Sequence, residues 1–114
     1  MKRTICMILS CLGFLFSAAA PADEALEEQG SRVFAHWCMP CHGDGPNFPG
    51  TTALRAKYQG QIEPVLADRG GMTPDFVKLY VRTGISIMPF FRKTEISDKE
   101  LEALAAYLTR HLEN

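Results

Sequence analysis

The sequence has neither a set of paired cysteines nor an excess of basic charge. Only 4 cysteines occur in 114 residues, and two of them, Cys6 and Cys11, lie in the apolar N-terminal segment. The remaining pair cannot form the disulfide framework that holds many small secreted domains together. The formal net charge is −1, so nothing in the composition indicates nucleic-acid binding.

A long hydrophobic run is also missing. The apolar segment at residues 5–16 is shorter than the roughly 20 residues that cross a bilayer. Two basic residues precede it, and small residues follow it up to an A-x-A sequence at residues 20–22, a pattern typical of a cleaved secretory signal peptide. We therefore expect residues 1–22 to be a signal peptide and residues 23–114 to be one periplasmic domain without a stable membrane anchor. A retained anchor is the alternative.

The chemistry of the chain is concentrated in the run W-C-M-P-C-H at residues 37–42. It contains C-x-x-C-H, the attachment signature of a c-type haem. Two cysteines three residues apart on a helical turn can each form a thioether with one vinyl group of the porphyrin. The histidine after the second cysteine then lies under the iron. The run predicts that Cys38 and Cys41 bind haem covalently and that His42 ligates its iron.

Two other kinds of site share parts of this motif. A W-C-x-P-C sequence is also typical of a thioredoxin-like dithiol site, and a cysteine pair can be half of a zinc site. The sequence offers no second cysteine pair for zinc. A thioredoxin fold would place a buried strand before the cysteines, which should be a continuous apolar run. Only residues 33–35 are apolar there, with Glu27, Glu28 and Arg32 just upstream, so the sequence favours haem.

Helix signals dominate the rest of the chain. Thr73-Pro74 is typical of a helix start, and Ser97 with Glu100 predicts a capping box. We expect helices over residues 23–38, 51–58, 74–83 and 98–112, the second with Thr51 or Thr52 near its N-cap, and a short helical piece around residues 62–66.

Small residues predict how the two end helices cross. Ala103, Ala105 and Ala106 permit another helix to approach closely, and Gly30 on the first helix is the natural counterpart. We therefore expect the two ends of residues 23–114 to pack together over one edge of the haem.

A second iron ligand is predicted in the run I-S-I-M-P-F-F at residues 85–91. Met88 lies in a non-helical loop next to a proline, among apolar and aromatic residues. A thioether on the iron face opposite His42 would favour the ferrous state and raise the reduction potential. The alternatives are that Met88 fills space in the core, or that Met72, in a glycine-rich loop, is the ligand.

Two further contacts with the haem are expected. A ligating histidine needs an acceptor for its other ring N–H, and a backbone carbonyl in the loop at residues 43–50, stiffened by Pro46, could provide it. A plain surface loop is the alternative there. Arg55, Lys57 and Tyr58 could reach the haem propionates, although a solvated helix face is the more common place for such side chains.

The sequence as a whole resembles the class I c-type cytochromes over residues 23–114. The resemblance rests on Gly30, Phe34 and Cys38 in the first helix, on Leu104, Tyr107 and Leu108 in the last, on the G-P-N turn at residues 45–47 and on the G-I-S-I-M-P run at residues 84–89. The loop between His42 and the G-P-N turn is shorter than in the mitochondrial members.

This resemblance implies an all-α small cytochrome c fold, with three to five helices around one covalently bound haem c. By the same resemblance, Cys38 and Cys41 form the thioethers, His42 and Met88 are the axial ligands, and the Pro46 carbonyl accepts a hydrogen bond from His42. Such a protein carries single electrons and is not itself an enzyme.

Residues 88–97 also resemble the cytochrome subunit of flavocytochromes of the p-cresol methylhydroxylase type and of related alkylphenol or eugenol hydroxylases. This resemblance implies an FAD flavoprotein partner that oxidises a phenol and passes electrons to the haem. A soluble acceptor, such as a copper protein or another cytochrome, would then be reduced.

Next to an exposed haem edge, Phe90 and Phe91 would form a docking surface for that flavoprotein, and Arg92 and Lys93 would bias partner choice. Both phenylalanines could instead be core residues. The remaining alternatives for the function are a free electron carrier for another dehydrogenase or oxidase, and a thioredoxin-like thiol-disulfide oxidoreductase.

Overall fold

The computed structural model describes residues 21–113 of the chain, so residues 1–20 of the signal peptide expected at residues 1–22 lie outside the described residues. The elements within this range are α1 (Ala22–Val33), the π-helical turn η1 (Phe34–Cys38), α2 (Met39–His42), α3 (Pro49–Tyr58), α4 (Pro74–Thr83), α5 (Asp98–Thr109) and the 3₁₀ turn η2 (Arg110–Glu113). Apart from one isolated bridge between Ile85 and Met88, residues 21–113 contain no β-structure. The all-α fold class is therefore confirmed.

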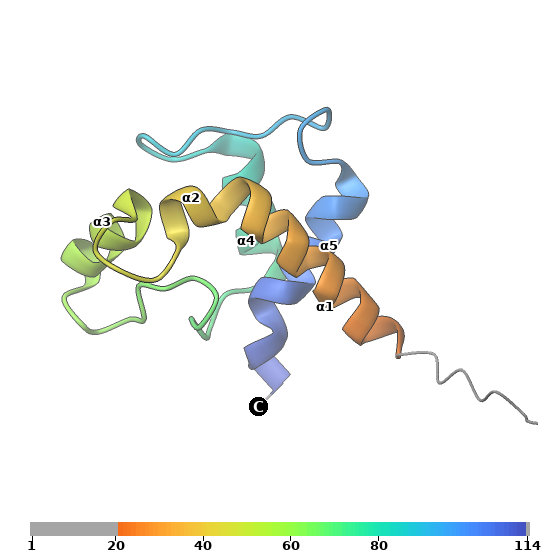
Figure 1. Ribbon diagram of the computed structural model, residues 1–114, viewed down its shortest axis with the longest axis horizontal. Helices are drawn as coiled ribbons and strands as arrows, with labels where there is room; N and C mark the ends of the chain where they lie inside the picture. Colours follow the sequence, from red (N-terminus) through yellow and green to blue (C-terminus); the bar gives the residue numbers. More distant parts are fainter. Residues whose placement is uncertain (1–20, 114) are drawn as a thin grey trace, which may run out of the picture.

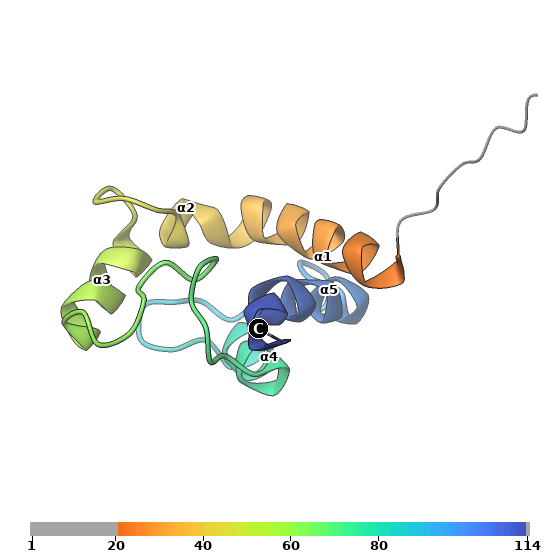
Figure 2. The same cartoon turned by 90° about the horizontal axis from the view of Figure 1, so that it is seen from below.

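The two end helices cross at a glycine. α1 lies across α5 in both views of the ribbon (Figure 1, Figure 2). A Cβ atom added to Gly30 would lie 2.0 Å from the carbonyl oxygen of Ala103 and 2.7 Å from Cβ of Tyr107. Only a residue without a side chain permits this approach, and the predicted pairing of Gly30 with the small residues of the last helix is confirmed.

The hydrophobic core lies where α1, η1, α4 and α5 meet. Its buried members are Val33, Phe34, Met72, Val77, Val81, Ile96, Leu101, Leu104, Ala105 and Leu108. Full burial of one large apolar side chain is worth about 1.5–3 kcal/mol, so this cluster dominates the stability of the domain. Trp37, Cys38 and Phe91 pack against the cluster while they stay partly exposed, which places the cysteine motif at the edge of the core.

The starts of α4 and α5 agree with the sequence signals. The Thr73 hydroxyl accepts a hydrogen bond from the N–H of Phe76 at 3.2 Å. Ser97 forms the predicted capping box, in which its hydroxyl accepts from the N–H of Glu100 and the Glu100 carboxylate accepts from the N–H of Ser97. No helix within residues 21–113 combines the length and the apolar character that a membrane span requires.

The segment between α2 and α4 departs from two expectations. α3 begins at Pro49, because proline is well suited to the first helical position, and Thr51 is therefore not a cap. Its side chain is fully buried and donates to the Gly43 carbonyl at 2.7 Å. The helical piece expected around residues 62–66 is absent, because Pro64 has no N–H to donate and disfavours a helix around it.

Candidate functional site

The helix changes from α to π geometry where it reaches the cysteine motif. In η1 the N–H of Met39 donates to the carbonyl of Phe34, five residues earlier. A π turn of this kind re-aims the side chains that follow it and is frequent at functional sites. Phe34 is buried, whereas Cys41 is exposed. The first helix extends as predicted, but the π turn was not predicted. Pro40 was the available signal, because it cannot make the α-helical hydrogen bond to residue 36.

The environment of the first thiol is unsuitable for dithiol chemistry. Cys38 is half-buried against the core. Burial, with a smaller contribution from the charge of Cys41, raises the pKa of the Cys38 thiol to about 12. A thioredoxin-like site needs a cysteine with a lowered pKa, because the thiolate is the nucleophile. The burial of Cys38 against the core therefore argues against the thiol oxidoreductase alternative.

His42 has one covered ring edge. Its Nδ1 is the one buried side-chain nitrogen or oxygen in the described part of the chain that lacks a hydrogen-bond partner. A Cβ atom added to Gly50 would lie 2.7 Å from Cε1 and 2.9 Å from Nδ1 of His42, so the first turn of α3 lies against this edge. Burial lowers the pKa of His42, which favours the neutral imidazole that binds metals.

The predicted contact between Pro46 and His42 is not formed. The Pro46 carbonyl accepts instead from the hydroxyl of Thr52 at 3.2 Å, and Nδ1 of His42 has no partner. The physical reason is the short loop after the histidine. Because α3 begins at Pro49, Gly50 and not a loop carbonyl covers the ring edge.

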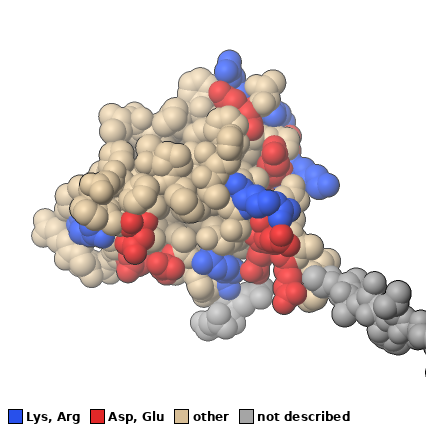
Figure 3. Space-filling model, in the orientation of Figure 1, with Lys and Arg blue, Asp and Glu red and all other residues tan. Residues whose placement is uncertain are grey.

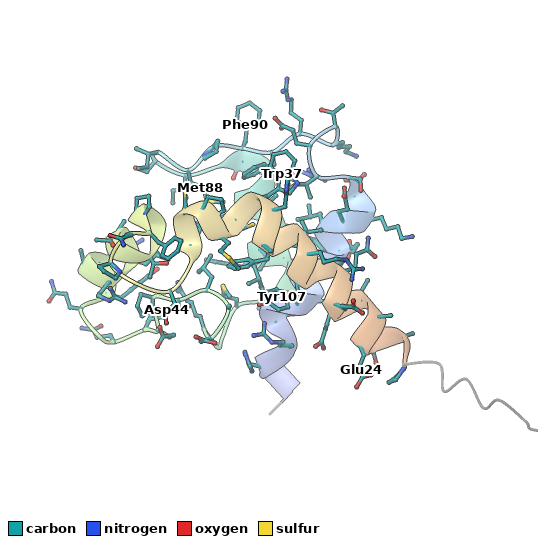
Figure 4. The ribbon with its side chains drawn as sticks, in the orientation of Figure 1. Glu24, Trp37, Asp44, Met88, Phe90 and Tyr107 are labelled. Atoms are coloured by element: carbon teal, nitrogen blue, oxygen red, sulfur yellow. The ribbon has the colours of Figure 1, made fainter. Side chains whose placement is uncertain are left out.

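Met88 is held in a tight turn. The N–H of Ile85 donates to the Met88 carbonyl at 3.1 Å, and the N–H of Met88 donates to the Ile85 carbonyl at 2.9 Å. Ser86 within this turn has a φ of 55°, a left-handed conformation that is uncommon for a residue with a side chain. Figure 4 shows Met88 and Trp37 on one side of the η1–α2 segment and Tyr107 on the other.

The alternative methionine lies elsewhere. Met72 is 5% exposed and belongs to the core cluster between α1, α4 and α5. It fills space there, which is the usual role of a buried methionine. Met88 is half-buried in its loop. Met72 is therefore buried as a core residue would be, whereas Met88 is accessible as a ligand would be.

Apolar side chains around Met88 are unusually exposed. Ile87 is 89% exposed, Phe90 60% and Ile85 48%. The space-filling view shows a broad uncharged face over this part of the molecule (Figure 3). Contiguous exposed apolar surface marks the place where a ligand or a partner binds.

A cation without a carboxylate partner lies in the loop before α4. Arg69 is 8% exposed and forms no ion pair with a carboxylate of residues 21–111. Its guanidinium lies 4.9 Å from the centre of the Tyr58 ring, and its hydrogen bond lowers the pKa of Tyr58. A buried guanidinium is costly without an anion, and carboxylates are its preferred partners. No feature of the sequence singled out Arg69.

These side chains together fit a haem. Val65 and Asp68, from the same loop as Arg69, line one cavity with His42. Thiols, an imidazole, a thioether, an apolar surface and a guanidinium without a carboxylate partner are groups that suit a porphyrin with vinyl groups, iron and propionates. Within the described residues no group of three or more His, Cys, Asp and Glu side chains is placed to hold a metal ion.

Comparison with known proteins agrees with this chemistry. A family model described as cytochrome C oxidase, cbb3-type, subunit III matches residues 25–108. This chain belongs to the cytochrome c family. Cytochrome c6 of Picosynechococcus sp. is 30% identical to it over 116 residues, an alignment that covers 100% of this chain and 97% of the relative. None of the solved structures matches the chain.

Family membership confirms the coarser predictions. The protein is a monohaem c-type cytochrome with one covalently bound haem c. It is an electron-transfer protein and not an enzyme.

Proposed function

We propose that Cys38 and Cys41 would hold the haem through thioethers and that His42 and Met88 would supply the two ligands of its iron. A haem held by these residues would supply one-electron chemistry through the ferric and ferrous states of its iron. The observation that carries the assignment of Met88 is its presentation on a hydrogen-bonded turn, whereas Met72 is packed in the core. His42 is poised as a neutral ligand because burial lowers its pKa.

The ligand assignment is tested by a matched pair of substitutions. Met88→Leu and Met72→Leu each remove a thioether with little change in volume, so the change in packing costs less than about 1.5 kcal/mol at either site. Loss of an iron–sulfur bond would add to this cost only at the residue that is the ligand. Met88→Leu should abolish the weak near-infrared band of iron–sulfur charge transfer in the oxidised protein and lower the reduction potential. Met72→Leu should preserve both. The opposite pattern would show that Met72 is the ligand.

The second part of the proposal concerns the electron donor. We infer that an FAD flavoprotein that oxidises a phenolic substrate reduces this cytochrome, which then reduces a soluble acceptor such as a copper protein or another cytochrome. The support is the resemblance of residues 88–97 to the cytochrome subunit of phenol-oxidising flavocytochromes, together with the exposed ring of Phe90. An apolar ring beside a redox centre is suited to the core of an interface.

The docking surface differs from the expectation, because Ile87 replaces Phe91. Phe91 is half-buried, and its ring meets the Trp37 ring edge-on at 5.8 Å, so it is not available to a partner. Arg92 pairs with Glu95 and Lys93 with Asp98, but the two basic side chains are 69% and 73% exposed. We therefore define the proposed donor surface as Ile87, Phe90, Arg92 and Lys93.

Affinity capture with the holoprotein tests this surface. Phe90→Ser removes its largest apolar ring, and Phe76→Ser is the matched control because Phe76 is also exposed, at 41%, but lies in the first turn of α4. Wild type and Phe76→Ser should retain a phenol-oxidising flavoprotein from native periplasm, and Phe90→Ser should lose it. If Phe90→Ser and Phe76→Ser retain the flavoprotein equally, the proposed donor surface is wrong. If no flavoprotein is captured, the proposed donor is wrong, and the alternative of a free electron carrier for another dehydrogenase or oxidase is favoured.

The cellular location completes the proposal. We propose that residues 1–22 are removed and that the protein acts in the periplasm. Because α1 begins at Ala22, cleavage after this residue leaves the helix essentially whole. N-terminal sequencing of protein from the periplasmic fraction should start at Asp23. A chain that retains residues 1–22 and fractionates with membranes would contradict this part.

A further inference from the structure

One side chain of α4 holds the exit of the loop that carries Met88. Nη1 of Arg82 donates to the Phe91 carbonyl at 3.0 Å and to the Ile96 carbonyl at 2.8 Å. Nη2 donates to Oδ1 of Asp98 at 2.9 Å. The Arg82 side chain is only 23% exposed. It therefore joins the end of α4, two points of the loop and the first turn of α5.

The chemistry of this contact requires an arginine. A guanidinium presents several N–H donors in a rigid fork, whereas the lysine ammonium is a point charge on a flexible stem. Charge-assisted hydrogen bonds to carbonyl groups are stronger than neutral ones, and a partly buried carbonyl left without a donor is costly. The main-chain N–H of Phe91 also donates to the Val81 carbonyl at 2.8 Å, so both main-chain polar groups of Phe91 are bound to the last turn of α4.

Phe91 transmits this restraint to the haem site. It lies three residues after Met88, and its ring packs on Trp37, the neighbour of Cys38. The start and the exit of the loop are also pressed together, because a Cβ atom added to Gly84 would lie 2.6 Å from the Met88 carbonyl oxygen. The position of Met88 relative to the attachment turn is thus set through Phe91.

We propose that Arg82 is a positioning residue that keeps the Met88 thioether on the iron. The inference rests on the proposed ligation by Met88. A second ion pair supplies the comparison, because Lys78 and Glu102 join the same two helices at 2.6 Å without contacting the loop. If Arg82 only joined α4 to α5, breaking either ion pair would have the same effect on the ligation of the iron by Met88.

Imidazole binding to the oxidised holoprotein distinguishes these roles. Imidazole reaches the iron only after Met88 has left, so its apparent affinity increases with the population of the released loop. Arg82→Gln should bind imidazole about tenfold more tightly than wild type, a change of about 1.4 kcal/mol. Lys78→Gln should remain within about twofold of wild type, because a surface ion pair contributes little.

Two further variants separate the carbonyl contacts from the ion pair. Arg82→Lys keeps the charge but cannot reach both carbonyls, so it should also bind imidazole several-fold more tightly. Asp98→Asn removes the charge partner and leaves the carbonyls in place, so its affinity should stay within about twofold of wild type. These two variants decide the question if Arg82→Gln does not accumulate as holoprotein.

Three results would overturn the inference. They are unchanged imidazole affinity in both Arg82 variants, an equal shift in Lys78→Gln, and an equal shift in Asp98→Asn. Failure of the ligand assignment is recognised separately. If the near-infrared band survives in Met88→Leu, Met88 is not the ligand, whatever the Arg82 variants show.

Discussion

Replacement of Gly30 by alanine should separate the two end helices. The added Cβ would lie 2.0 Å from the carbonyl oxygen of Ala103 and 2.6 Å from its carbonyl carbon, against an ordinary van der Waals contact of at least 3.4 Å. Backbone atoms of α5 cannot rotate away as a side-chain end could. α1 must therefore move outwards by more than 1 Å at the point where Ala103 and Leu104 are both 0% exposed.

The magnitude follows from two opposing effects. Overpacking of a core typically costs about 1–3 kcal/mol, and a contact with backbone should lie at the upper end of this range. Alanine in place of glycine favours a helix by about 1 kcal/mol. The net loss in the free energy of unfolding should be about 2 kcal/mol. For a domain of this size it corresponds to a decrease in Tm of about 8–16 °C.

Urea denaturation of the holoprotein, followed by far-ultraviolet circular dichroism, measures this loss. Gly70→Ala is the matched control, because a Cβ atom there meets nothing within 4 Å, and its stability should stay within about 0.5 kcal/mol of wild type. If Gly30→Ala is as stable as wild type, the close crossing of α1 and α5 is refuted.

Three further predictions concern single contacts. Thr51→Val leaves a buried carbonyl without its donor and should cost about 1–3 kcal/mol, whereas Thr52→Val, at an exposed contact, should cost less than about 0.5 kcal/mol; equal losses in thermal melts would contradict the difference in burial. Glu100→Gln should destabilise more at pH 7 than at pH 3. The hydroxyl and N–H of Ser97 lower the pKa of Glu100 in the folded state, so its stabilisation is present above the unfolded pKa of about 4.3 and is lost as the pH falls through the folded pKa. Urea denaturation at the two pH values checks this, and a pH-independent effect contradicts it. In haem-free protein, iodoacetamide should alkylate Cys38 more slowly than the exposed cysteine of the same motif, because burial raises the pKa of Cys38 to about 12; peptide mapping that finds Cys38 modified first contradicts the assigned burial.

Features that depend on neighbouring residues in the sequence could be predicted. The capping box at Ser97 and the start of α4 after Thr73 follow from hydrogen bonds that close within three residues. The pairing of Gly30 with the last helix could also be predicted, because small residues at a crossing leave a clear compositional signal. Cys38, Cys41 and His42 form a motif whose spacing is itself the chemistry.

Features that depend on tertiary contacts could not be predicted. The three partners of Arg82 lie 9 to 16 residues away along the chain, and the burial of Arg69 depends on how an irregular loop folds over Tyr58. The same reason explains why the predicted contact of Pro46 is wrong, since the point at which α3 begins decides which group covers His42. Phe90 and Phe91 are adjacent and alike in type, so the sequence could not show that only one of them packs on Trp37.

The most direct test of the central claim is the intact mass of the purified, acid-unfolded protein. Thioethers to Cys38 and Cys41 survive unfolding, so the mass should equal that of the polypeptide plus one haem. A variant with both cysteines replaced by alanine should show the polypeptide mass alone. A wild-type mass without haem would contradict the account that this chain carries electrons on a covalently bound haem c.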